Sequence, residues 1–196
     1  MSAHSGVGSH SPDTAAAQGN VLLGVKLAIL SEVMLFGALF AAYFVVRSES
    51  PGWPPLGHIE RPELLLPGLN TLLLVSSSGT MQWAVRSARR GDRLQTLRRL
   101  GLTLVLGGIF IVIQGYEFAT NGFGLDAGIF GSTFYTLTGF HGAHVLAGLG
   151  LIGIVANRVR RGLVSADRHT AVEAVSYYWH FVDAVWLFLF STLYVL

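Results

Sequence analysis

The chain has 196 residues, of which 52% are hydrophobic and 12% are charged, and its mean hydropathy is +0.54. Soluble domains carry about 25% charged residues, so the composition excludes an ordinary soluble domain and indicates a protein of the lipid bilayer. The net charge is +2 and cysteine is absent, which excludes nucleic-acid binding by a broad basic face, disulfides, thiolate-bound zinc and iron–sulfur clusters within the chain.

The first twenty residues are rich in Ser, Ala, Gly and His and have no basic segment leading into an apolar core. We expect residues 1–20 to be a disordered tail and not a cleaved signal peptide. The rest, 21–196, is predicted to be one transmembrane domain.

Five stretches in that domain reach the length of about 20 mostly apolar residues that a spanning helix needs. The sequence therefore predicts an all-α membrane protein with five transmembrane helices. Four prolines fall in the first connection and Pro67 lies in the first turns of the second helix, where it is tolerated. The expected spans are 21–46, 64–85, 97–118, 127–156 and 174–196.

Basic residues are concentrated in two of the four connections. Positive charge in short loops marks the cytoplasmic side, so both basic connections are expected there, with the N-terminus cytoplasmic and the C-terminus outside. The other connections hold few basic residues or none. The arginines are Arg86, Arg89, Arg90, Arg93, Arg98 and Arg99 in one basic connection and Arg158, Arg160, Arg161 and Arg168 in the other.

Small residues recur at spacings of four on two of the expected helices. Gly139, Ala143 and Ala147 form one row, and Gly37 and Ala41 form a shorter one. Membrane helices pack closely where small side chains let their backbones approach. These rows predict tight helix pairs.

Ionisable residues fall inside four of the five expected spans. An acidic or basic residue at the centre of a membrane helix costs about 2.5 to 3.5 kcal/mol on insertion scales, so these groups should face the bundle, pair with one another or be neutral. Two pairs are spaced three residues apart and share a helix face. The candidates are Glu32, Glu117, His141, His144, His180 and Asp183.

The residues alone leave three interpretations of this set open. A metal or haem site would use His side chains from facing helices. A proton relay would use the Glu and His side chains as exchangeable groups along a path. A buried, mutually hydrogen-bonded framework would fix the helix register, and one satisfied network would then account for every member. One bundle of five helices can hold a cluster of Glu32, His141, His144, His180 and Asp183.

A long motif lies in the last span. Residues 177–188, Tyr-Tyr-Trp-His-Phe-Val-Asp-Ala-Val-Trp-Leu-Phe, resemble the last-helix signature of subunit III of the haem-copper cytochrome c oxidases. Further segments agree in chain order, so the resemblance covers roughly residues 21–196. They are Ser31-Glu32, Trp53-Pro54-Pro55, Leu69-Asn70-Thr71, Gly91-Asp92-Arg93, Gln114 with Glu117-Phe118, Gly131-Ser132-Thr133-Phe134 and Gly139-Phe140-His141-Gly142-Ala143-His144-Val145.

The resemblance implies the short, five-helix bacterial form of this subunit, in an aa3- or caa3-type oxidase of the bacterial plasma membrane. It implies a non-catalytic chain without haem or copper of its own, those cofactors lying in partner subunits. The chain would pack directly on subunit I, in a complex that includes subunit II, and would bind phospholipid. It would support aerobic electron transport, proton uptake and turnover stability. An isolated chain would have no redox centre.

The resemblance also implies roles for single residues. Glu32 corresponds to a buried carboxylate that is hydrogen-bonded toward the His141 and His144 region. Arg158 lies where the family places a basic residue near a lipid head group, although a role as a topology determinant explains it equally well.

Three rival functions are compared with this one. In subunit III of a related quinol oxidase the last-helix motif is less aromatic before Trp-His and less rich in Leu after it, so Tyr177, Tyr178 and Leu187 favour the cytochrome c branch. A free-standing ion or proton transporter is disfavoured because the chain has no internal repeat. A membrane haem protein would be recognised by the visible spectrum of the isolated chain.

Overall fold

A computed structural model describes residues 12–50, 53, 64–125 and 127–195, with side chains from residue 16 onward. These residues form five long helices, and a π-helical segment continues the last one. The expected all-helical fold with five helices is confirmed. The elements are α1 (Pro12–Glu49), α2 (Leu65–Arg89), α3 (Arg93–Thr120), α4 (Gly128–Arg160), α5 (Thr170–Phe190) and η1 (Ser191–Val195).

Several helices extend beyond the expected spans. α1 begins at Pro12, within the segment expected to be a disordered tail, and residues 1–11 lie outside the described part. α2 and α4 continue to Arg89 and Arg160. Arginine is a good helix former, and positive charge in the last turn stabilises the helix dipole, so these helices run past their apolar segments.

Four of the helices are long and apolar enough to cross a bilayer, namely α1, α3, α4 and α5 with η1. The chain is a multi-pass membrane protein. α2 is 25 residues long but more polar. Several of its polar side chains face the bundle: Asn70 and Ser77 are fully buried, and Thr80 Oγ1 lies 2.7 Å from Thr103 Oγ1 of α3. Mean hydropathy therefore undervalues α2, because the polar face contacts protein.

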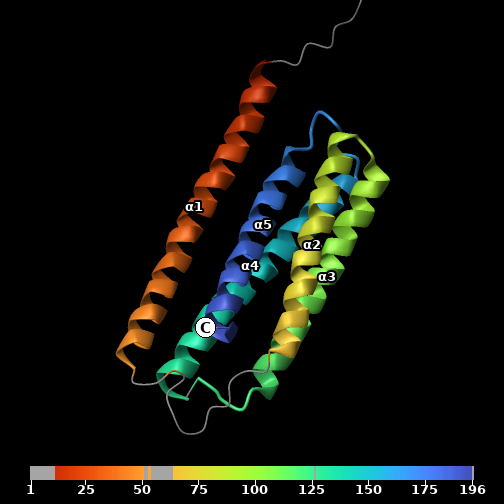
Figure 1. The fold of residues 1–196 in the computed structure, drawn as a ribbon. Coiled ribbons are helices and arrows are strands. Elements are labelled where there is room, and N and C mark those ends of the chain that lie inside the picture. The colour runs from red at the N-terminus through yellow and green to blue at the C-terminus, as the bar shows by residue number, and fades with distance from the viewer. Residues whose placement is uncertain (1–11, 51–52, 54–63, 126, 196) are drawn as a thin grey trace, which may run out of the picture.

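The helices are arranged around α4 and α5, as Figure 1 shows. α2 and α3 pack against each other and against α5 and α4 respectively, which closes a four-helix bundle. α1 lies on the other side and contacts α5 and, to a smaller extent, α4. The molecule therefore consists of a bundle of α2–α5 and one peripheral helix.

Trp179 of α5 lies at the centre of the four-helix bundle and is fully buried. A Cβ atom on Gly107 of α3 would come within 2.7 Å of its ring, and one on Gly148 of α4 within 2.9 Å. These two glycines leave the room that the indole fills. Its Nε1 donates to Ser77 Oγ at 2.9 Å, so one side chain ties three neighbouring helices to α5.

The rows of small residues predicted to form tight helix pairs do not do so within this chain. Gly37, Ala41, Ala143 and Ala147 are exposed, and a Cβ atom on Gly37 or Gly139 would meet nothing within 4 Å. That prediction was wrong for the described residues. A spacing of four residues marks a helix face but does not say which face meets a neighbour.

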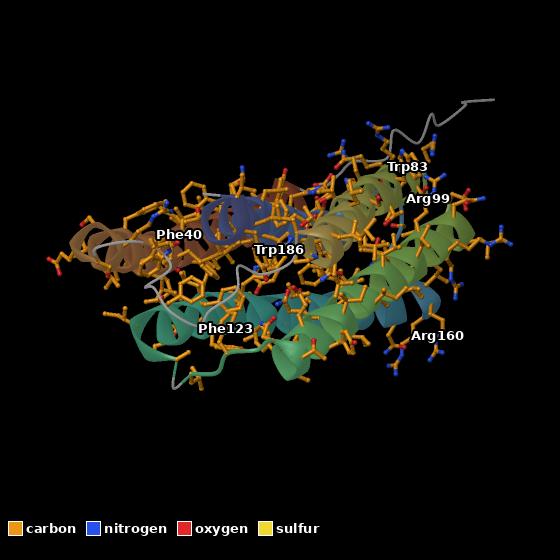
Figure 2. The ribbon with its side chains drawn as sticks, turned by 60° about the horizontal axis from the view of Figure 1, so that its bottom comes forward. Phe40, Trp83, Arg99, Phe123, Arg160 and Trp186 are labelled. Carbon is orange, nitrogen blue, oxygen red and sulfur yellow. The ribbon has the colours of Figure 1, made fainter. Side chains whose placement is uncertain are left out.

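The two ends of the bundle differ in charge. The α2–α3 turn (90–92) and the α4–α5 connection (161–169) lie at one end, which we call the arginine end. Figure 2 shows Arg99 and Arg160 toward this end and Phe40 and Phe123 toward the other. The Arg93 guanidinium donates to the Arg160 carbonyl oxygen. The two basic connections thus lie together, as their shared charge predicted.

The end of the bundle at the α3–α4 connection (121–127), away from the arginine end, is called the opposite end below.

Candidate functional site

Glu32 of α1 and His144 of α4 form a polar pair across the helix interface. Glu32 Oε2 lies 2.9 Å from His144 Nε2, and His144 Nδ1 lies 2.7 Å from the Phe140 carbonyl oxygen. A carbonyl oxygen only accepts hydrogen bonds, so Nδ1 carries a proton. The Nε2–Oε2 bond needs one more proton, which sits on either partner, so the pair has no net charge in either form.

The surroundings of this pair place it at the side of the bundle. The Glu32 side chain is 34% exposed and that of His144 is 16% exposed. The Phe36 ring packs edge-on against His144, with centroids 5.0 Å apart, and the Tyr178 hydroxyl donates to the His144 carbonyl oxygen at 3.2 Å. Because a neutral pair needs less solvation than a lone carboxylate, Glu32 is tolerated at membrane depth on a partly open face.

His180 and Asp183 of α5 meet Ser78 of α2. The Ser78 hydroxyl donates to Asp183 Oδ2, and its oxygen lies 2.9 Å from His180 Nδ1. A hydroxyl has one proton to donate, and Ser78 directs it toward Asp183. The ring nitrogen of His180 is therefore the donor in its bond with the Ser78 oxygen. Asp183 is 5% exposed. This chain of hydrogen bonds holds α2 to α5 inside the bundle.

His141 is fully buried in the aromatic core. Its ring stacks on Trp186 with centroids 5.0 Å apart and meets the edge of Phe110 at 5.9 Å. Neither ring nitrogen has a hydrogen-bond partner among the described residues. The expected link from Glu32 therefore reaches His144 and not His141. The six ionisable candidates do not form one shared hydrogen-bond network.

Glu117 of α3 lies nearer the opposite end and is 6% exposed. Gln114, one turn earlier on the same face, is 4% exposed. Tyr194 of η1 lies close to both, without a hydrogen bond of ordinary geometry to either. The six ionisable candidates are therefore divided among four places in the fold.

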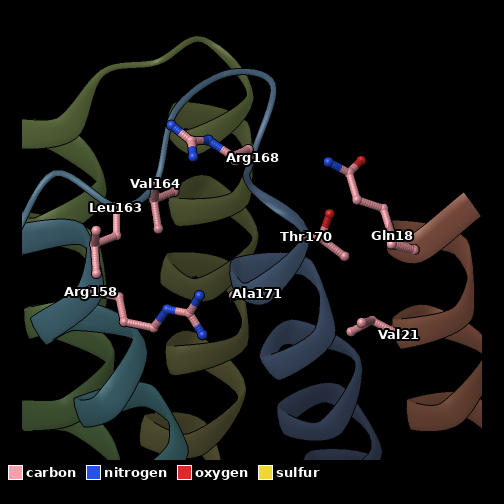
Figure 3. A pocket seen from close by; sticks show the side chains of 9 residues that line it. Gln18, Val21, Arg158, Leu163, Val164, Arg168, Thr170 and Ala171 are labelled. Atoms are coloured by element: carbon pink, nitrogen blue, oxygen red, sulfur yellow. The ribbon is translucent and has the colours of Figure 1, made fainter. Parts of the chain in front are cut away.

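A pocket of about 470 Å³ opens at the arginine end between α1, α4 and α5. Figure 3 shows Arg158 extending from α4 toward Ala171, with Arg168 above it and Gln18 on α1 across the space. Its other lining side chains include Val21, Leu163 and Val164, so the pocket combines apolar walls with two guanidinium groups. Neither Arg158 nor Arg168 makes an ion pair with a carboxylate within the described part of the chain.

The described residues contain no group of three or more His, Cys, Asp or Glu side chains placed to hold a metal ion. The histidines explain why. His141 is enclosed by aromatic rings, His144 is bonded to Glu32, and His180 is bonded to Ser78. The interpretation as a metal site thus has no ligand set in this part of the chain.

Three polar residues of these sites were not singled out as site residues from the sequence. Ser78 lies in a run of three serines and looks like an ordinary small residue of a helix. Tyr178 and Tyr194 look like the aromatic residues common in membrane helices. A signal for Ser78 exists in hindsight, since serine in the polar α2 faces the two ionisable residues of α5.

Comparison with known proteins agrees with the motifs. Residues 3–196 match the family model described as cytochrome c oxidase subunit III. The chain is 39% identical over 176 residues to a cytochrome c oxidase subunit 3 of Thermostichus vulcanus, covering 89% of this chain and 87% of that one. It is 44% identical over 176 residues to the same subunit of Synechocystis, covering 89% and 75%.

A relative from Drosophila yakuba, also a cytochrome c oxidase subunit 3, is 41% identical over 177 residues, covering 87% of this chain and 67% of that one. The similarity thus extends from bacterial to animal proteins, and the range matched by the family model includes all five helices. The chain belongs to the cytochrome c oxidase subunit III family.

Proposed function

We propose that this chain is the non-catalytic subunit III of an aa3- or caa3-type oxidase in a bacterial plasma membrane. It packs on subunit I, in a complex that also contains subunit II, and the arginine end faces the cytoplasm. The observation that carries the proposal is the family match along residues 3–196. Haem and copper belong to the partner subunits, and this chain contributes a scaffold that sustains proton uptake and turnover.

The pocket at the arginine end supports phospholipid binding as part of this role. Arg158 and Arg168 are exposed and have no carboxylate partner in the described part of the chain. A guanidinium forms strong, charge-assisted hydrogen bonds with a phosphate, and the apolar residues that line the same pocket, such as Val21 and Val164, suit an acyl chain. A phospholipid there would fill the space between α1 and the bundle.

Glu32 supports turnover stability in this proposal. It joins the peripheral α1 to α4 through His144, in a pair that keeps its net charge at zero whichever partner holds the proton. A group of this kind can pass a proton without creating a charge in the membrane. The pair thus combines attachment of α1 with a proton-linked role.

The assignment is tested by purifying the tagged chain from its native membrane in mild detergent. We expect it to bring down subunits I and II, with a visible spectrum of haem a. Recovery of the chain without a haem-containing partner would contradict the proposal. A haem spectrum from the chain alone would instead indicate a membrane haem protein.

The electron donor decides between the cytochrome c and quinol branches. We expect the purified complex to oxidise reduced cytochrome c and to be inactive with a quinol alone. Turnover with the quinol and none with cytochrome c would assign the chain to a quinol oxidase. The aromatic pair Tyr177 and Tyr178 favours the first result.

The role of Glu32 is tested with Glu32→Gln in the assembled complex. Glutamine keeps the shape and one hydrogen bond to His144 but cannot share a proton. We expect normal assembly and initial activity, followed by faster loss of activity during turnover. Immediate loss of all activity in a fully assembled complex would point to an essential proton path, and unchanged durability would leave Glu32 purely structural.

Lipid binding is tested with Arg158→Gln and Arg168→Gln together, using native mass spectrometry of the complex. We expect the double variant to retain less phospholipid than the wild type. Arg161→Gln is the matched control, because Arg161 is exposed at the same end and does not line the pocket. Equal loss of lipid in the control would assign the effect to general surface charge.

A further inference from the structure

One face of α3 places polar side chains in the interior of the bundle near the opposite end. Gln114 and Glu117 are three residues apart and share one face of α3, and Asn121 caps the C-terminus of the helix. Gln114 and Glu117 are 4% and 6% exposed, and Tyr194 of η1, which faces them, is 9% exposed. We call these four residues the Gln114 site.

Each residue of the Gln114 site has a buried polar atom without a partner among the described residues. They are both polar atoms of the Gln114 amide, Oε2 of Glu117, Nδ2 of Asn121 and the hydroxyl of Tyr194. Buried polar groups in folded proteins nearly always have a hydrogen-bond partner, since leaving one unsatisfied costs about 1 to 3 kcal/mol. Several such atoms together indicate a bound molecule.

The mixture of groups identifies the class of molecule. The amide nitrogens of Gln114 and Asn121 only donate hydrogen bonds, while the amide oxygen and the carboxylate only accept them. A metal cation would leave the amide N–H groups of Gln114 and Asn121 without an acceptor, and an anion would leave the amide oxygen of Gln114 without a donor. Water both donates and accepts, and buried waters typically make about three hydrogen bonds to such groups. We infer that ordered water molecules bind at the Gln114 site.

The surroundings set the two limits of the Gln114 site along the chain. Toward the bundle centre, Phe110 closes the face by packing against His141 and Trp186. At the other limit, Asn121 ends α3 and is half-buried, so it connects the interior with the opposite end.

Aromatic rings wall the Gln114 site on the side of α4. Phe134 lies 5.8 Å from Tyr194, and Tyr135 lies 5.0 Å from Phe118, both between ring centroids. η1 is π-helical, and π-helical segments are frequent at functional sites. In the inferred arrangement, water reaches Glu117 from the opposite end, past Asn121. This inference does not depend on the role proposed for Glu32 or for the lipid pocket.

X-ray radiolytic footprinting in isotopically labelled water tests the inference on the chain purified with its bound partners. Hydroxyl radicals formed from a bound water label the side chain beside it. We expect Tyr194 to be labelled several-fold faster than Tyr43, which is also buried. Tyr43 is the matched control because its hydroxyl donates to the Thr192 carbonyl oxygen at 3.2 Å and accepts from Trp53 Nε1 at 3.1 Å.

Equal labelling of Tyr194 and Tyr43 would overturn the inference. Gln114→Leu provides a second measurement, since leucine has a similar size and binds no water. We expect it to reduce labelling of Tyr194 and to lower the thermal midpoint of the complex. A raised thermal midpoint would show that the Gln114 amide binds no water in the wild type, which would contradict the inference. Should Gln114→Leu not assemble, Glu117→Gln is the second variant, because glutamine retains water-binding groups. We expect Tyr194 to be labelled in Glu117→Gln as in the wild type. Loss of Tyr194 labelling in that variant would count against the site.

Discussion

The peripheral helix α1 and the bundle of α2–α5 are held in different ways. In their most apolar stretches, 17% of the residues of α1 are buried, compared with 44% in α5 with η1. The bundle is built on complementary sizes, with Trp179 fitted against Gly107 and Gly148. α1 stands to one side of the bundle in Figure 1 and is held mainly through its contacts with α5.

The contacts of α1 also change along its length. Toward the opposite end its aromatic residues Phe36, Phe40 and Tyr43 are buried. Toward the arginine end the contacts are polar, as where Gln18 Nε2 donates to the Asp167 carbonyl oxygen at 2.9 Å and Lys26 lies 5.8 Å from the Tyr177 ring. From this difference we expect the bundle to resist change as a unit and α1 to be attached at points that are separable by mutation.

The largest effect should come from the centre of the bundle. Trp179→Ala removes a fully buried indole and the donor to Ser77, and we expect a loss of about 3 to 5 kcal/mol in stability. Trp83→Ala is the control, because Trp83 is 52% exposed. The check is the unfolding midpoint of the detergent-solubilised protein. Similar shifts in the two variants would refute the view that size complementarity holds α2–α5 together.

A smaller and more local effect is expected for Phe40→Ala on α1. Phe40 packs edge-on against Phe188 of α5, with centroids 4.5 Å apart, and its loss should cost about 3 kcal/mol, confined to the attachment of α1. We expect α1 to become sensitive to protease while the bundle stays resistant. Met34→Ala, at a residue 71% exposed, should change nothing. Simultaneous loosening of α5 would show that the two regions are not separable.

The fold was predictable from the sequence because span length and apolar composition are local properties. Five helices followed from them, and the basic connections were placed at one end. Hydropathy alone is weak for α2, since Ser77 and Thr80 lower its mean while lying inside the bundle. Which neighbour a helix face meets, by contrast, depends on tertiary packing. The prediction that the rows with Gly37 and Gly139 form tight helix pairs was therefore wrong.

The site was predictable in part. The resemblance linked Glu32 to the region of His141 and His144, and the contact with His144 is confirmed. Residues three apart on a helix point in directions that differ by about 60°, given about 3.6 residues per turn. His144 therefore meets α1 while His141 turns into the aromatic core, and no spacing rule could say which of the two would do so.

A substitution at the contact between α2 and α5 should have an effect of intermediate size on stability. Ser78→Ala removes the hydroxyl that serves both His180 and Asp183 and leaves a buried carboxylate oxygen without its donor. We expect a loss of about 1 to 3 kcal/mol, seen as a lower unfolding midpoint. Ser76→Ala is the matched control on the same helix, because Ser76 is exposed and bonds only to the Leu72 carbonyl oxygen. Equal shifts of the unfolding midpoint in the two variants would show that the hydrogen bonds of Ser78 with His180 and Asp183 do not stabilise the bundle.

The smallest effect is expected at the arginine end, where the bundle meets water. Arg89 Nε lies 2.7 Å from Glu173 Oε1, and the Arg89 side chain is 56% exposed. Exposed ion pairs contribute about 0.2 to 1 kcal/mol and are screened by salt, so Arg89→Gln should shift the unfolding midpoint slightly at low salt and not at high salt. His169 Nε2 lies 3.1 Å from the same oxygen of Glu173, so the carboxylate keeps a neighbour when Arg89 is replaced. A large shift that persists at high salt would mean that this end, too, is held as firmly as the core around Trp179.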